Sequence, residues 1–178
     1  MKVNNGTLFL ALMLALTVVS CSRKKETDTI ITKIELPKVS RETKSVGTGD
    51  VSKTFQWGDM MYDSKVSVTA DKSAPVVKDD DGNRYYDNTA TLVIDGPKGQ
   101  IFSREFRKGD FSSCIDTGYL KPSKSTVLGI AFNKVENGNA LFVATVGSPD
   151  TMADEYMLVG ISISKAGGVT MSRIEETE

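Results

Sequence analysis

Apolar and polar side chains alternate with a period of two along much of the chain after residue 55. Residues 65–70 place Val66, Val68 and Ala70 on one side, and residues 89–95 and 100–106 show the same alternation. This period is typical of β-strands with one buried face. Further strands are predicted at residues 125–134, 140–147, 156–165 and 169–174.

Turn residues separate these predicted strands in pairs. The connections read Gly-Pro-Lys-Gly at 96–99, Glu-Asn-Gly-Asn at 136–139 and Ala-Gly-Gly at 166–168. Asn-Gly favours the positive φ angles of a tight hairpin turn. We therefore predict a mainly β fold, an antiparallel meander that forms a single sandwich or barrel-like domain. At most one short helix is expected, at about residues 110–118, with Asp110 as its N-cap.

The N-terminal segment has a different pattern, an uncharged apolar run over residues 8–19 that follows Lys2. A helix of this length reaches about 18 Å, against about 30 Å for the hydrocarbon core of a membrane. The run therefore favours a secretory signal over a membrane-spanning helix. It ends in Thr-Val-Val-Ser-Cys at 17–21, which resembles the lipobox of bacterial lipoproteins. That resemblance implies a diacylglyceryl group on Cys21 and cleavage before it; the alternative is a buried helix with an incidental cysteine.

These segments divide the chain into three parts. Residues 1–20 are predicted to be a cleaved signal peptide, residues 21–53 a lipidated Cys21 with a flexible tether, and residues 54–178 the β domain. Residues 22–53 are rich in Lys, Thr, Ser and Glu, but the apolar segment at 29–36 could pair as an edge strand. The first charges after Cys21 are basic, which favours an outer-membrane anchor facing the periplasm over display on the cell surface.

Charge and composition exclude several classes of function. Residues 22–53 hold 8 basic and 5 acidic side chains, and residues 54–178 hold 13 and 18, so the predicted domain is acidic and unsuited to nucleic acid. The chain has no histidine, which removes Ser-His and Cys-His nucleophile pairs. Apart from Cys21, Cys114 is the only thiol, so no disulfide forms within the domain and Cys114 is expected to be buried.

Clustered carboxylates make Asp79, Asp81, Asp150 and Asp154 the candidates for a metal site. An EF-hand loop ending its turn at Gly82 would need its first ligand at Val77, which has no oxygen in its side chain. We therefore expect both acidic loops to lie at exposed turns, with no tight metal site and no cofactor. If the fold brings the two loops together, a weak Ca²⁺ site becomes credible.

Aromatic and sulfur-bearing side chains are the candidates for a binding surface. They are Trp57, Met61, Tyr62, Tyr85 and Tyr86. Tryptophan and tyrosine bury a large area with few rotatable bonds, and methionine adapts to irregular partners. The alternative is that the group around Trp57 caps one end of the β core.

Several short motifs occur in a recognisable order. They are Asp-Gly-Asn-Arg-Tyr-Tyr-Asp-Asn at 81–88, Phe-Ser-Arg-Glu-Phe-Arg-Lys-Gly-Asp-Phe at 102–111, Val-Leu-Gly-Ile-Ala-Phe at 127–132 and Val-Gly-Ser-Pro-Asp at 146–150. With the lipobox, they resemble an uncharacterised family of Bacteroidetes lipoproteins, a domain of unknown function. The resemblance implies a compact β fold and supplies no catalytic residue.

Two functions from different classes follow. The first is a membrane-anchored, non-catalytic module of the cell envelope that binds or assembles a protein, peptide or glycan. The second is a small envelope hydrolase that uses paired carboxylates, with or without calcium. The absence of a phosphate loop or a serine nucleophile motif favours the first.

Overall fold

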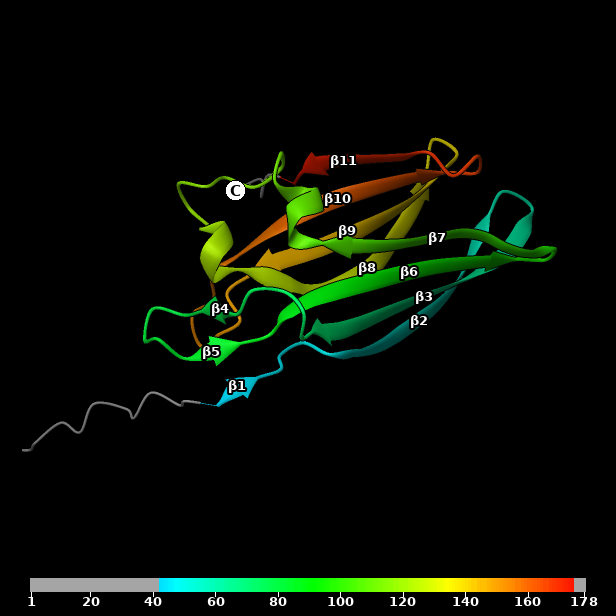
Figure 1. The fold of residues 1–178 in the computed structure, drawn as a ribbon. Coiled ribbons are helices and arrows are strands. Elements are labelled where there is room, and N and C mark those ends of the chain that lie inside the picture. The colour runs from blue at the N-terminus through cyan, green and yellow to red at the C-terminus, as the bar shows by residue number, and fades with distance from the viewer. Residues whose placement is uncertain (1–41, 175–178) are drawn as a thin grey trace, which may run out of the picture. The chain divides into compact units, whose positions relative to one another are not determined.

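The computed structural model describes residues 42–174, all within the compact unit Lys38–Glu178. The described part is mainly β, as predicted, and two four-stranded antiparallel sheets pack on each other (Figure 1). The first sheet has the strand order β2-β3-β6-β7, with β2 (Gly49–Trp57), β3 (Met60–Asp71), β6 (Asp87–Gly96) and β7 (Gly99–Arg107). The second has the order β11-β10-β9-β8, with β8 (Thr126–Glu136), β9 (Asn139–Gly147), β10 (Tyr156–Ser164) and β11 (Val169–Arg173).

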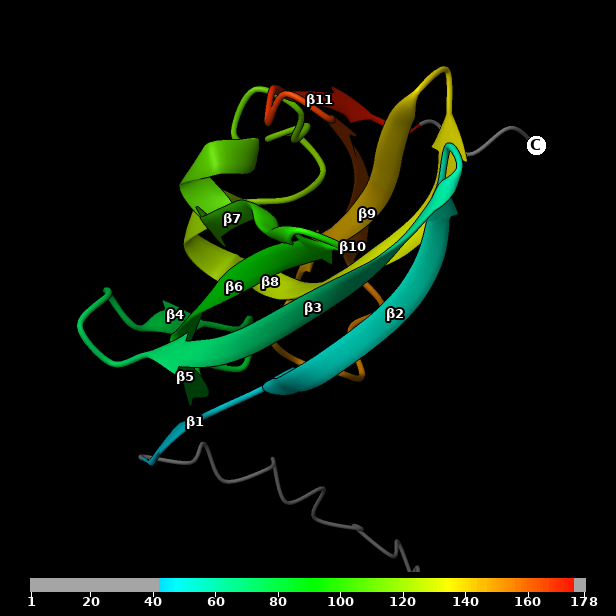
Figure 2. The same ribbon diagram turned by 90° about the vertical axis from the view of Figure 1, so that its right-hand side faces the viewer.

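Of the two arrangements expected from the sequence, the structure shows the sandwich. Strand β8 lies against β6 and β3 where the two sheets approach each other (Figure 2). A small third sheet of β1 (Thr43–Lys44), β5 (Arg84–Tyr85) and β4 (Val77–Lys78) lies at one end, opposite the turns of the long hairpins. In this sheet β1 pairs parallel to β5.

The three predicted hairpins, β6/β7, β8/β9 and β10/β11, are confirmed. In the β8/β9 turn, Asn137 and Gly138 both have positive φ, at 50° and 78°, which is the conformation that Asn-Gly favours. A fourth hairpin, β2/β3, turns at Gly58, which also has a positive φ of 67°.

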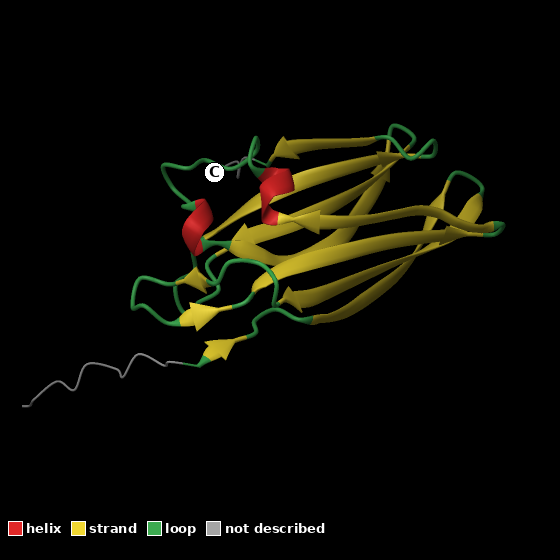
Figure 3. Ribbon diagram, in the orientation of Figure 1, coloured by secondary structure: helices red, strands yellow, loops and turns green. Residues whose placement is uncertain are grey.

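The helical content among the described residues is limited to two 3-10 helices, η1 (Lys108–Phe111) and η2 (Pro122–Lys124) (Figure 3). The first replaces the helix expected at 110–118: the Asp110 carboxylate accepts the Arg107 N–H at 2.8 Å, and the Cys114 N–H bonds to the Phe111 carbonyl three residues before it. That spacing makes tight turns in place of an α-helix. In the described part, no helix is long and apolar enough to span a membrane.

The predicted boundary at residue 54 is wrong, because the sheets begin earlier. Strand β2 starts at Gly49 and pairs along its whole length with β3. Its first six residues are exposed, so their side chains show no hydrophobic alternation. Backbone pairing holds them in the sheet, together with polar contacts such as the ion pair of Asp50 with Lys65 at 3.1 Å. The predicted signal peptide, Cys21 and the segment 29–36 lie outside the described residues.

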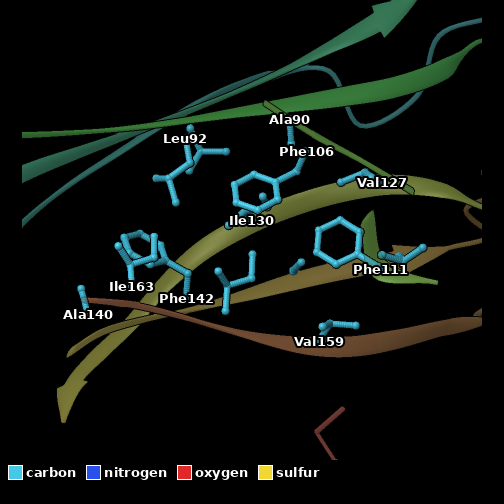
Figure 4. Packing of buried hydrophobic residues seen from close by; sticks show 14 of the residues in the cluster. Ala90, Leu92, Phe106, Phe111, Val127, Ile130, Ala140, Phe142, Val159 and Ile163 are labelled. Carbon is cyan, nitrogen blue, oxygen red and sulfur yellow. The ribbon is translucent and has the colours of Figure 1, made fainter. Parts of the chain in front are cut away.

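Buried side chains from the two long sheets fill the space between them (Figure 4). Strand β6 contributes Ala90, Leu92 and Ile94, each with no exposed surface. They face residues of the second sheet such as Phe142 and Val159. Cys114 is buried beside this core, as predicted.

A buried polar cluster fixes one end of the two sheets to each other. Asp87 on β6 accepts the Thr126 hydroxyl from β8 at 2.7 Å and pairs with the Lys108 ammonium at 2.9 Å. The neighbouring Asn88 side chain donates to the carbonyls of Val127 at 2.9 Å and Val46 at 2.7 Å. The cluster therefore ties the chain entering β2 to both sheets.

Candidate functional site: a tyrosine groove

The predicted aromatic binding surface around Trp57 does not exist as a surface. Trp57 is only 1% exposed, and its indole N–H donates to the Gly138 carbonyl at 2.9 Å. Its ring packs against Tyr62, which is also buried, at a centroid distance of 5.3 Å. Trp57 and Tyr62 are thus part of the core, as the alternative expects, whereas Met61 is exposed.

The other predicted binding residues do not form a common surface. Tyr85 is buried, Tyr86 is half-buried, and Met61 is 55% exposed. Met61 lies at the start of β3, whereas Tyr86 precedes Asp87, which pairs with Asp71 at the far end of β3. The two side chains are therefore about 30 Å apart along the sheet.

The fold does bring the two acidic loops together. Asp79, Asp80 and Asp81 line a small pocket of about 70 Å³ with Asp150 and Glu155 from the loop between β9 and β10. Lys124 of η2 lines the same pocket and forms an ion pair with Asp80. Asp154, the remaining candidate, lies outside this pocket.

The expectation of exposed turns holds for Asp80 and Asp81 but is wrong for Asp79, which is 7% exposed. Its carboxylate accepts the backbone N–H of Asn83 at 2.7 Å, the side-chain amide of Asn83 at 2.8 Å and the Tyr85 hydroxyl at 3.2 Å. Burial alone would raise the pKa of Asp79, but these hydrogen bonds outweigh it and hold the pKa below its ordinary value. Asp79 therefore closes its own turn.

Besides burial, the carboxylates of the two acidic loops also raise the pKa of Tyr85. Its pKa is raised by burial, then by the hydrogen bond and charge of Asp79, and further by the charges of Asp150 and Asp81. Even so, no three or more His, Cys, Asp or Glu side chains within residues 42–174 are grouped so as to hold a metal ion.

A broader groove, of about 620 Å³, lies where the start of β10, the end of β11 and the loop between η1 and η2 meet. Figure 1 shows these three segments side by side. Two tyrosines on different segments line it: Tyr119, 57% exposed, and Tyr156, 40% exposed. We call this the tyrosine groove, and it is lined by Tyr119, Asp154, Tyr156, Met157, Leu158, Arg173 and Ile174.

A close backbone approach places Tyr156 at the groove. Tyr156 pairs with Gly147 of β9, and the Ser148 N–H bonds to the Glu155 carbonyl at 2.8 Å, which closes the loop between them. A Cβ atom on Gly147 would lie 2.6 Å from that carbonyl oxygen. Only glycine at position 147 therefore allows this closure without a shift of the loop.

A tight turn places Tyr119. The Asp116 carbonyl accepts the N–H groups of Tyr119 and Leu120, at 3.1 and 2.8 Å, and the Asp116 carboxylate accepts the Gly118 N–H at 2.9 Å. Leu120 is buried in the core and anchors the turn. Tyr119, the residue before this anchor, remains 57% exposed and lines the groove.

Arg173 extends the tyrosine groove along β11. It also lines a second hollow of about 360 Å³, together with residues of the 113–116 loop and β11. The Arg173 guanidinium lies 3.6 Å from the Asp116 carboxylate, so an ion pair spans the junction of the two hollows.

Backbone groups of β10 also face the groove. The Ile174 N–H donates to the Leu158 carbonyl at 3.1 Å, and no described residue of β11 stands beyond it. Backbone groups on a strand point to alternate sides, so the N–H and C=O of Tyr156 point the same way as those of Leu158.

Sequence reasoning missed both tyrosines. The sequence predicts Tyr156 only as the first residue of a strand, and Tyr119 follows the helix expected at 110–118. The one available signal was an aromatic residue in a polar loop, because such a side chain often has no core to enter.

The fold and the groove together define a small β-sandwich domain with an aromatic groove at one end. Residues 28–171 match the model of a protein family described as a domain of unknown function, DUF4738, and the chain belongs to this family. The match begins well before residue 54, so the family domain includes much of the predicted tether. No curated protein matches the chain.

Proposed function

We propose that this protein is a lipid-anchored, non-catalytic binding module of the bacterial cell envelope, and that it holds its ligand in the tyrosine groove. The observation that supports it is the pair of exposed rings, Tyr119 and Tyr156, on separate segments around a groove of about 620 Å³. Ligand sites are typically concave, with aromatic walls and a few polar groups that fix orientation.

The groove is built to stay open without a ligand. Tyr156 is fixed by the closed loop at Gly147, and Tyr119 by the turn at Asp116. A backbone that is already fixed at both tyrosines loses little conformational entropy on binding, so more of the contact energy appears as affinity.

The hydrolase alternative finds less support in the carboxylates. A general acid in such an enzyme needs a raised pKa and a facing carboxylate across a cleft. Asp79, the buried member of the acidic pocket, has instead a lowered pKa and three hydrogen-bond donors.

Photo-crosslinking at the groove tests the binding role. We expect a photoreactive phenylalanine analogue at position 119 to give an ultraviolet-dependent adduct in intact cells. The same analogue at Ile101, an exposed position on the β7 side of the β6/β7 hairpin, is the control. Identical adduct patterns at the two positions, or none at position 119, would count against the proposal.

The anchor is proposed at Cys21, facing the periplasm from the outer membrane. Replacing Cys21 by Ser removes the thiol that would carry the lipid, and no described helix could take over anchoring. We expect Cys21→Ser to lose both fatty-acid labelling and membrane fractionation while the domain stays folded by circular dichroism. Label on the variant would contradict the lipoprotein assignment.

A further inference from the structure

We propose that the ligand of the tyrosine groove is a neutral glycan. This rests on the proposed binding function and adds the chemical class of the ligand. Three features carry it: the aromatic rings, the mixture of polar groups between them, and the sign of the surrounding charge.

The two rings provide flat apolar contact surfaces. The face of an aromatic ring is electronegative and packs well against polarised C–H groups, which line the faces of sugar rings. Tyr119 and Tyr156 keep hydroxyl groups that can also bond to a ligand, since each is both donor and acceptor. With 57% and 40% of their surfaces exposed, both rings are accessible from the groove.

The polar groups of the groove match sugar hydroxyls. Asp154 offers acceptors only and Arg173 offers donors only, and both line the groove. A sugar hydroxyl gives and takes hydrogen bonds, so neighbouring hydroxyls can satisfy both kinds of group at once.

A peptide fits this site less well. A peptide that adds to a sheet edge depends on a row of backbone hydrogen bonds. Here that edge of β10 is already occupied: β11 pairs with it from Val159 to Ile163, and the Ile174 N–H donates to the Leu158 carbonyl at 3.1 Å.

The surrounding charge favours a neutral sugar over an acidic one. Among the described residues, Arg173 is the only cationic side chain in the lining of the tyrosine groove, and it is paired with Asp116 at 3.6 Å. Asp154 adds a carboxylate that forms no ion pair within residues 42–174, and Asp150 and Glu155 lie on the same loop. A uronate or sulfate group would meet net repulsion here.

Calorimetric titration of the mature protein tests the inference. The probes are neutral hexasaccharides built from glucose, mannose and N-acetylglucosamine, with an oligogalacturonate of equal length as the acidic comparison. We expect at least one neutral probe to bind and the acidic probe not to. Tyr119→Ala and Tyr156→Ala should each weaken binding about tenfold, the loss expected for one aromatic contact. Met61→Ala, which removes an exposed side chain outside the groove, is the matched control and should bind as the wild type does.

The outcomes separate this inference from the binding role itself. If no neutral probe binds, or only the acidic one does, while position 119 still crosslinks to a polypeptide, the glycan inference is wrong and the binding role stands. If neither titration nor crosslinking detects a ligand, both the glycan inference and the proposed binding function are wrong. Equal weakening by Met61→Ala and the tyrosine variants would place the glycan elsewhere and also overturn the inference.

Discussion

The carboxylate of Asp79 lies inside the turn that it closes, where Asn83 and Tyr85 supply its hydrogen bonds. Its neighbours Asp80 and Asp81 are exposed, although the sequence alone does not distinguish these three consecutive aspartates. The difference arises because residue 83 folds back over residue 79, and the Asp79 N–H bonds to the Asn83 carbonyl at 3.2 Å. One carboxylate of the run thereby becomes structural.

Replacing Asp79 should destabilise the domain in a pH-dependent way. Asp79→Asn puts an amide against the donors of Asn83 and Tyr85, and we expect it to cost about 1.5–3 kcal/mol at pH 7, as for hydrogen bonds to a charged group. The pKa of Asp79 is lower in the folded protein than its ordinary value, so its stabilising contribution is present above about pH 4 and is lost as the pH falls through the folded pKa. The gap between wild type and variant should therefore narrow below about pH 4.

Urea unfolding at a series of pH values measures this gap. Asp81→Asn removes the same charge from an exposed neighbour and should leave stability within about 0.5 kcal/mol of the wild type. A gap for Asp79→Asn that is constant from pH 7 to pH 3 would show that the ionised carboxylate is not what stabilises the turn.

At the scale of elements, the sequence predicts best those strands that bury one face. Strands β6, β9 and β10 alternate because their inward residues fill the core, so their patterns follow from packing. Strand β2 could not be found this way, since residues 49–54 are exposed on both faces and gain their place through backbone pairing with β3. A paired edge strand leaves little trace in the hydrophobic pattern.

The tyrosine groove could not be predicted from the hydrophobic pattern either. It combines residues from three segments, Tyr119, Tyr156 and Arg173, which are brought together by loop closure and strand register. The sequence identifies the carboxylates that are candidates for a metal site, but it does not predict which of them the fold brings close together. Trp57 was predicted to be a binding residue but is buried in the core, which is where large aromatic side chains are more often found.

At the scale of the whole molecule, the segment that enters β2 is coupled to both sheets through Asn88. This side chain is 1% exposed, and its amide donates to Val46 on the entering segment and Val127 on β8. Its Oδ1 has no hydrogen-bond partner among the described residues, so the amide donors carry the hydrogen bonding of this side chain. The Lys44 carbonyl accepts the Tyr86 N–H at 2.9 Å beside it.

Two truncated proteins should reveal this coupling, one starting at residue 42 and one at residue 49. They differ only in residues 42–48, which include the Lys44 and Val46 carbonyls. We expect the shorter protein to be less stable by about 1–3 kcal/mol, because a buried amide donor is left without its acceptor. Urea midpoints of the two proteins measure the difference. In an Asn88→Ala background the difference should shrink, since that variant has no amide to leave unsatisfied. Equal urea midpoints in the wild-type background would mean that residues 42–48 do not hold the sandwich together. If the difference in stability is as large in the Asn88→Ala background, residues 42–48 stabilise the domain through another contact, such as the approach of Gly47 to the Leu128 carbonyl.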